Sequence, residues 1–216
     1  MRIATLAGIP LRLHWSFVGL AGLFALFILW TTGPFESFQL LFLGTVLFGS
    51  VVLHELGHAL AARVYGIDTA HITLYPFGGI AAITRMPTSP RQELVIALAG
   101  PAVNFVIFAA ALLLWLPIGG WVLVAVGGLN LLMGVFNLLP AFPMDGGRVL
   151  RALLADRWGW VPASRFAMGV GQIFAIGLLG LGVVTLQDEF PGSGDTFEHY
   201  AYTALFALGQ ADALTM

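Results

Sequence analysis

Long apolar stretches separated by short polar connections run through most of this sequence. Residues 14–31 contain no Asp, Glu, Lys or Arg, and a helix needs about 20 mostly apolar residues to cross a bilayer core. Only 9% of the 216 residues are charged, whereas a soluble domain carries about a quarter. The sequence therefore predicts an all-α polytopic membrane protein with about six transmembrane helices. They are expected at about residues 14–31, 38–65, 90–116, 120–139, 162–186 and 197–214.

The charges between these stretches predict how the chain is oriented. All nine basic residues are arginine, and they precede the first stretch or lie at or between the second and third and the fourth and fifth. The other connections hold only acidic residues, so the positive-inside rule predicts cytoplasmic N- and C-termini in a multi-pass cell-membrane protein. Trp15 and Trp30 at the ends of the first stretch favour a retained helix over a cleaved signal peptide.

Composition excludes several kinds of site. The net charge of −2 argues against binding nucleic acid by phosphate neutralisation, and no nucleic-acid partner is expected. Cysteine is absent, which excludes disulfides, thiolate zinc sites and a cysteine nucleophile. Any metal must therefore be held by His, Asp or Glu.

Residues 66–85 differ from the apolar stretches. They alternate apolar and polar side chains, are rich in β-branched residues and are broken by a Pro-Phe-Gly-Gly segment at 76–79. This pattern is typical of short strands or a hairpin. Because open strand edges are not tolerated against lipid, we expect this small β element at the membrane interface or along a cavity.

The sequence HELGH at residues 54–58 lies inside the second apolar stretch. Residues i and i+4 of a helix share a face, so His54 and His58 can bind one metal ion, while Glu55 can reach water at that metal without being a ligand. HExxH also occurs by chance in soluble helices. Within a membrane, however, each charged group costs about 2.5–3.5 kcal/mol, so a compensating ion is favoured here. Zinc is expected, because its catalytic sites use three N or O ligands plus water.

A third ligand must come from elsewhere, and several residues are candidates: Asp145, Asp68, Glu93, His14, His71 and His199. Asp145 lies where Pro140 and Pro143 would end a helix and Gly146-Gly147 would free the backbone. The alternative for Asp145 is an N-cap, because Asp before Gly-Gly-Arg could begin a helix over 146–156.

Several segments together resemble the site-2 protease family of intramembrane zinc metalloproteases (peptidase family M50). HELGH is followed by NLLPAFPMDGG at 137–147, and GIPLRLHWSF at 8–17 is similar to the family's opening. YPFGG at 75–79 resembles its glycine-containing strand, and AGPAVN at 99–104 its third-helix motif. Without an inserted PDZ domain, the chain looks most like the archaeal and bacterial branch that often carries C-terminal CBS domains. A single transmembrane metalloprotease domain, with neither CBS nor PDZ domain, is expected over residues 1–216.

The resemblance implies a zinc metalloendopeptidase with Glu55 as general base. Three residues would bind one zinc ion per chain: His54, His58 and Asp145. Asn137 would position substrate or stabilise the oxyanion, and the strand near Phe77, Gly78 and Gly79 would pair with an unwound substrate backbone. The expected substrate is a membrane-anchored protein cleaved within or near its transmembrane segment in regulated intramembrane proteolysis, and the bilayer is the other expected partner.

Some alternatives stay open at this point. Asn104 could support a metal ligand or form an interhelical hydrogen bond; the bond is favoured for Asn104 and for Asn130. An aspartyl intramembrane protease is a rival hypothesis because Gly192-Ser193-Gly194-Asp195 matches a GxGD pattern, but no second intramembrane Asp faces it. A non-catalytic zinc carrier is the other rival, although it would have no use for Glu55.

Overall fold

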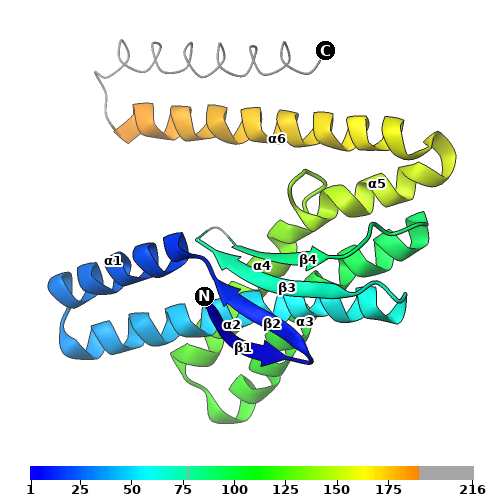
Figure 1. The fold of residues 1–216 in the computed structure, drawn as a ribbon. Coiled ribbons are helices and arrows are strands. Elements are labelled where there is room, and N and C mark those ends of the chain that lie inside the picture. Colours follow the sequence, from blue (N-terminus) through cyan, green and yellow to red (C-terminus); the bar gives the residue numbers. More distant parts are fainter. Residues whose placement is uncertain (77, 190–216) are drawn as a thin grey trace. The chain divides into compact units, whose positions relative to one another are not determined.

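The computed structural model describes residues 1–76 and 78–189. Two compact units divide the chain, Met1–Val170 and Gly171–Met216. Most described residues are helical, with a small sheet in the first unit (Figure 1), so the predicted fold class is confirmed. Phe77, His199, the GxGD segment and the expected helix over 197–214 lie outside the described residues.

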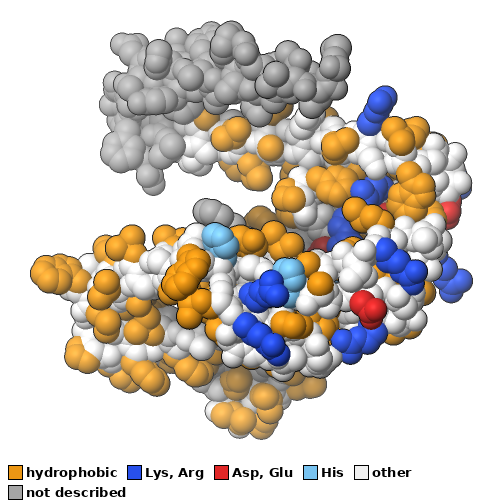
Figure 2. All heavy atoms as spheres, viewed as in Figure 1, with side chains coloured by type: hydrophobic (Ala, Val, Ile, Leu, Met, Phe, Trp, Pro, Cys, Tyr) orange, Lys and Arg blue, Asp and Glu red, His pale blue; other side chains and the backbone are white. Residues whose placement is uncertain are grey.

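Six helices are formed by the described residues: α1 (Trp15–Thr31), α2 (Pro34–Val64), α3 (Pro90–Ile118), α4 (Trp121–Asn137), α5 (Asp145–Trp158) and α6 (Trp160–Glu189). All except α5 coincide with predicted spans to within about one turn. Within the described residues, α2, α3 and α6 are long and apolar enough to cross a membrane, and α1 and α4 are shorter apolar helices. Trp30 is 89% exposed, and Figure 2 shows hydrophobic side chains over the α1 end of the first unit. These surfaces suit contact with lipid, and the protein has a membrane-protein fold.

The sheet has the strand order β1 (Arg2–Leu6), β2 (Ile9–Leu13), β3 (Thr69–Tyr75) and β4 (Gly78–Ile83). The antiparallel pair β3–β4 is the element predicted for residues 66–85. The hairpin β1–β2 was not predicted. Its turn uses Ala7 at φ 49° and Gly8 at φ 82°, and two consecutive positive φ values match the twist of a two-residue hairpin loop.

The sheet is held on α2 by an apolar cluster. Its buried members come from β2, α1, α2 and β3: Ile9, Leu11, Phe17, Val52, Ala59, Ile72 and Leu74. Strand β2 runs parallel to β3, with Leu11 opposite Ile72, so the N-terminal hairpin braces the β3–β4 hairpin. This packing places β4, an edge strand in the described structure, beside α2, with Gly79 next to Glu55.

Glycine allows α2 and α3 to approach closely. A Cβ atom on Gly57 of α2 would lie 2.7 Å from the carbonyl oxygen of Ala99 on α3, which is closer than real side chains come. A Cβ atom on Gly100 would lie 2.7 Å from Nε2 of His54. The backbone of α3 therefore forms the floor beneath the histidines of α2.

Candidate active site

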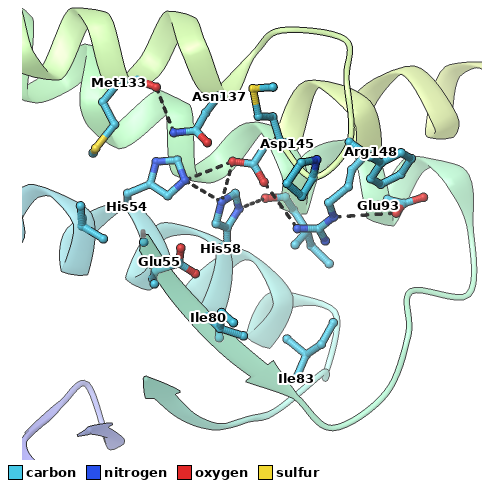
Figure 3. Close-up of a pocket in the computed structure, with 18 of the residues that line it drawn as sticks. His54, Glu55, His58, Ile80, Ile83, Glu93, Met133, Asn137, Asp145 and Arg148 are labelled. Carbon is cyan, nitrogen blue, oxygen red and sulfur yellow. Dashed lines mark hydrogen bonds and ion pairs between the residues drawn. The ribbon is translucent and has the colours of Figure 1, made fainter. Parts of the chain in front are cut away.

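His54 and His58 lie one turn apart on the buried face of α2 and point toward the same position (Figure 3). Their Nε2 atoms are 3.1 Å apart, and each lies 3.1 Å from Oδ2 of Asp145. These residues form a group whose ligand atoms lie within 4.8 Å of one another. The structure thus brings together His54 and His58, which the HExxH pattern assigned to a metal, and Asp145, which the family resemblance implied as the third ligand.

The segment between α4 and α5 turns tightly to deliver Asp145. A Cβ atom on Gly147 would lie 2.8 Å from the backbone nitrogen of Phe142, and Gly146 is just as crowded by the carbonyl groups of Leu138 and Leu139. The N-cap alternative for Asp145 is wrong in detail, since α5 begins at Asp145 itself and its N-cap is Met144. The carboxylate is therefore free to face the imidazoles.

The spacing of the three atoms fits one tetrahedral ion. Two ligands at about 2.0–2.1 Å from a tetrahedral zinc lie roughly 3.3 Å apart. The separations here are all 3.1 Å. The donor set of two imidazole nitrogens and one carboxylate oxygen is also one that catalytic zinc sites use.

The far side of each imidazole has its own partner. Nδ1 of His58 lies 2.6 Å from the carbonyl oxygen of Ile96, and Nδ1 of His54 lies 2.6 Å from Oδ1 of Asn104. Asn104 also donates to Asn130 at 3.0 Å, which is the interhelical hydrogen bond favoured for both residues, so Asn104 bonds His54 of α2 and Asn130 of α4 at once.

The second oxygen of Asp145 faces an arginine. Oδ1 lies 3.6 Å from Nη1 of Arg148, one turn further along α5. Burial alone would raise the pKa of the Asp145 carboxyl, but its hydrogen bonds with the two histidines outweigh burial and hold that pKa below its usual range. The group is therefore an ionised carboxylate, the form that binds metals.

The four other candidate ligands that lie in the described part of the chain are not members of this group. Glu93 is 1% exposed and pairs with the guanidinium group of Arg151. His14 caps α1 by accepting from the backbone nitrogen of Ser16, and its ring stacks on Tyr75. His71 lies on β3 opposite Ala82 of β4, and Asp68 is exposed.

The three residues open onto a cavity of about 890 Å³ in the first unit. Glu55 lines it beside them, and so do Asn137 at the end of α4 and Gly78 and Gly79 of β4. The side-chain nitrogen of Asn137 donates to the carbonyl oxygen of Met133, which leaves its amide oxygen available to the cavity (Figure 3). A cavity of this size lies within the range of about 300–1,000 Å³ that is typical of ligand sites.

Comparison with known proteins agrees with this geometry. The model of peptidase family M50 matches residues 42–120 and 118–181. A zinc metalloprotease of Methanocaldococcus jannaschii is 38% identical over 192 residues, which cover 87% of this chain. The chain belongs to peptidase family M50. Another similar protein is stage IV sporulation protein FB of Bacillus subtilis, which is 30% identical over 63% of this chain.

A solved structure supports the fold of this M50 chain. The site-2 protease from Methanocaldococcus jannaschii superimposes with a TM-score of 0.67 at 36% identity, covering 86% of each chain. Among the curated relatives, the chain spans about half of their length, 55% of the archaeal protein and 49% of the sporulation protein.

Proposed function

We propose that this chain is an intramembrane zinc metalloprotease that hydrolyses peptide bonds within or near the transmembrane segments of membrane-anchored proteins. The observation that carries the proposal is the convergence of His54, His58 and Asp145 beside Glu55 in one cavity. The two histidines and Glu55 lie on a helix long and apolar enough to cross a membrane. Membership in peptidase family M50 supports the same activity.

His54, His58 and Asp145 would hold one zinc ion per chain. When bound, the ion supplies Lewis acidity that lowers the pKa of water at its open position. Glu55 lines the cavity next to these ligands and would take the proton from the attacking water before passing it to the leaving amine. Asn137 would hold the substrate carbonyl or stabilise the oxyanion from the opposite wall of the cavity.

The edge strand β4 would bind the substrate backbone. A transmembrane helix hides its amides in internal hydrogen bonds, so the scissile bond must be unwound before attack. Gly78 and Gly79 lie on the cavity wall, and an edge strand offers free backbone groups for β-augmentation. Phe77, between β3 and β4, is part of the same proposal.

The proposal also covers how the chain is arranged in the membrane. The apolar helices would cross the cell membrane several times, with both termini in the cytoplasm, within a single transmembrane metalloprotease domain. The cavity would be supplied with water from the cytoplasmic side, because the arginines cluster at or between α2 and α3 and at or between α4 and α6, which favours that side.

Replacing Glu55 tests the function and separates it from a non-catalytic zinc carrier. Glu55→Gln is expected to keep one zinc per chain and to lose at least about 100-fold of its activity on a membrane-spanning model substrate, because a positioned general base contributes about 10²–10⁴-fold. Asp145→Ala is the matched variant that should lose the metal itself. Zinc content and cleavage are measured on the same purified, detergent-solubilised samples. A Glu55→Gln protein with wild-type cleavage, or an Asp145→Ala protein with undiminished zinc, would contradict the assignment.

A further inference from the structure

A chain of buried amides connects the zinc site to two backbone carbonyl groups elsewhere in the bundle. Asn104 on α3 is 0% exposed and Asn130 on α4 is 1% exposed, and Ser50 on α2 is also buried. Nδ1 of His54 lies 2.6 Å from Oδ1 of Asn104, and Nδ2 of Asn104 donates to Oδ1 of Asn130 at 3.0 Å. We call Asn104, Asn130 and Ser50 the amide relay.

The far end of the amide relay has a fixed direction. Nδ2 of Asn130 donates to the carbonyl oxygen of Val126 at 2.9 Å and to Oγ of Ser50 at 3.0 Å. A backbone carbonyl can only accept. The hydroxyl group of Ser50 donates its hydrogen to the carbonyl oxygen of Val46 at 3.1 Å. Toward Asn130, Ser50 can therefore only accept. Both contacts require the NH₂ group of Asn130 at this end and therefore place its Oδ1 toward Asn104.

The same polarity is passed on to His54. Because Asn130 presents an oxygen, Asn104 must present its NH₂ group to Asn130 and its oxygen to the imidazole. That oxygen accepts a hydrogen bond, so the proton of a neutral His54 ring resides on Nδ1. Nε2, which faces His58 and Asp145, then carries the free lone pair that a metal requires.

We infer that Asn104 and Asn130 are positioning residues that fix the tautomer and ring orientation of His54, with the carbonyl groups of Val46 and Val126 setting the direction of the amide relay. The two histidines are supported differently. His58 uses the carbonyl oxygen of Ile96, which cannot turn around, whereas a side-chain amide could turn and needs the relay to hold it. The inference rests on the proposed zinc site.

The tautomer can be measured without metal. The full chain is labelled with ¹⁵N-histidine and stripped of zinc in detergent, and the ring nitrogens of His54 are assigned with a His54→Gln sample. In the metal-free chain Nδ1 of His54 is expected to carry a proton, and Nε2 carries a proton as well wherever it donates to the carboxylate of Asp145. A wild-type protein in which Nδ1 carries no proton would overturn the inference.

Zinc affinity, measured by competition with a chelator, tests the role of each amide. Asn104→Leu should weaken zinc binding about 10–100-fold, the usual effect of losing a partner behind a metal ligand. Asn104→Asp keeps an acceptor for the Nδ1 proton and should stay within a few-fold of wild type. Asn130→Leu should weaken binding less than Asn104→Leu and leave the His54 proton distributed over both nitrogens. Ser37→Ala is the control. Ser37 is a buried serine in the first turn of α2, far along the helix from His54, and it bonds Thr32. Its replacement should change neither the zinc affinity nor the His54 tautomer.

A purely structural role for Asn104 predicts a different pattern, in which Asp and Leu destabilise the fold alike and leave the tautomer unchanged. That pattern, or a folded Asn104→Leu protein with wild-type zinc affinity, would overturn the inference. If Asn104→Leu does not fold, the zinc affinity of Asn104→Asp and the protonated nitrogen of His54 in the wild-type chain still test the inference. A wild-type chain that shows the Nδ1 proton but binds no zinc would contradict the proposed function and leave the relay standing.

Discussion

Gly79 of strand β4 lies directly against the side chain of Glu55. A Cβ atom on Gly79 would lie 3.0 Å from Cδ and 3.1 Å from Oε1 of Glu55, so no larger residue fits between strand and carboxylate without moving one of them. The family resemblance implied that the strand near Gly78 and Gly79 pairs with the substrate backbone. The structure gives Gly79 a different requirement, which is to hold the strand close to the proposed base.

Gly79→Ala should therefore reduce turnover by displacing Glu55. We expect kcat to fall about 10–100-fold, because the contribution of a general base depends on its position. Zinc content should stay at one per chain, since Glu55 is not a ligand. Kinetics and metal analysis on the same sample check this, with Ile80→Val on the same strand as control. Wild-type kcat in Gly79→Ala would show that the base tolerates the shift.

Substrate docking is better tested at Ile80 than at Gly79. The side chain of Ile80 is 58% exposed and lines the cavity, and a Cβ atom is already present there. Ile80→Ala removes apolar contact area worth about 1–1.5 kcal/mol and should raise KM for a membrane-spanning substrate by up to about tenfold, with little change in kcat. An unchanged KM would argue against contact between this strand and the substrate.

Gly100→Ala should damage the metal site although it favours the helix. Alanine is about 1 kcal/mol better than glycine in a helix interior, but here its methyl group would meet the Nε2 atoms of both histidines. Zinc affinity is expected to fall at least about tenfold, read by chelator competition. Gly128→Ala on α4 is the matched control, because nothing lies within 4 Å of its Cβ position, and it should bind zinc normally. Equal zinc affinity in both variants would mean that α3 can move away from α2.

The Glu93–Arg151 pair should respond asymmetrically to mutation. Glu93 is 1% exposed on α3, while the side chain of Arg151 on α5 is 23% exposed. Arg151→Met leaves a buried carboxylate with only Arg148, whose Nε is 3.9 Å away, and should cost near the lower end of about 3–5 kcal/mol. Glu93→Gln leaves an arginine that can reach water and should cost less. Unfolding of both variants and of the double variant in detergent measures the difference, and equal costs would contradict the burial argument.

The local features of this protein could be predicted from its sequence. The apolar stretches set the positions of α1, α2, α3, α4 and α6, because helices in lipid are specified by their own composition. The alternation at 66–85 predicted β3 and β4 for the same local reason. His54, Glu55 and His58 share one short motif, and Asp145 entered through the resemblance because nothing local distinguishes a ligand from an N-cap.

The features that were missed depend on residues far apart in the chain. The hairpin β1–β2 is positioned by the pairing of Leu11 with Ile72. These residues are about sixty positions apart, so no local sequence pattern predicts that they pair. The amide relay joins α2, α3 and α4 in the same manner, and the sequence showed only isolated polar residues in apolar helices. An asparagine in each of two adjacent apolar helices was the available signal.

The parallel pairing of β2 with β3 also limits how many times the chain can traverse a bilayer between them. Leu13 lies opposite Leu74, and paired strands are only about 4.8 Å apart, whereas a hydrocarbon core is about 30 Å thick. The two strands cannot share a ladder from opposite compartments. The number of membrane crossings made by α1 and α2 together must therefore be even, and this holds independently of the orientation predicted from the arginines. A cysteine introduced at Thr5 and one introduced at Thr84 should accordingly react with a membrane-impermeant reagent from the same side.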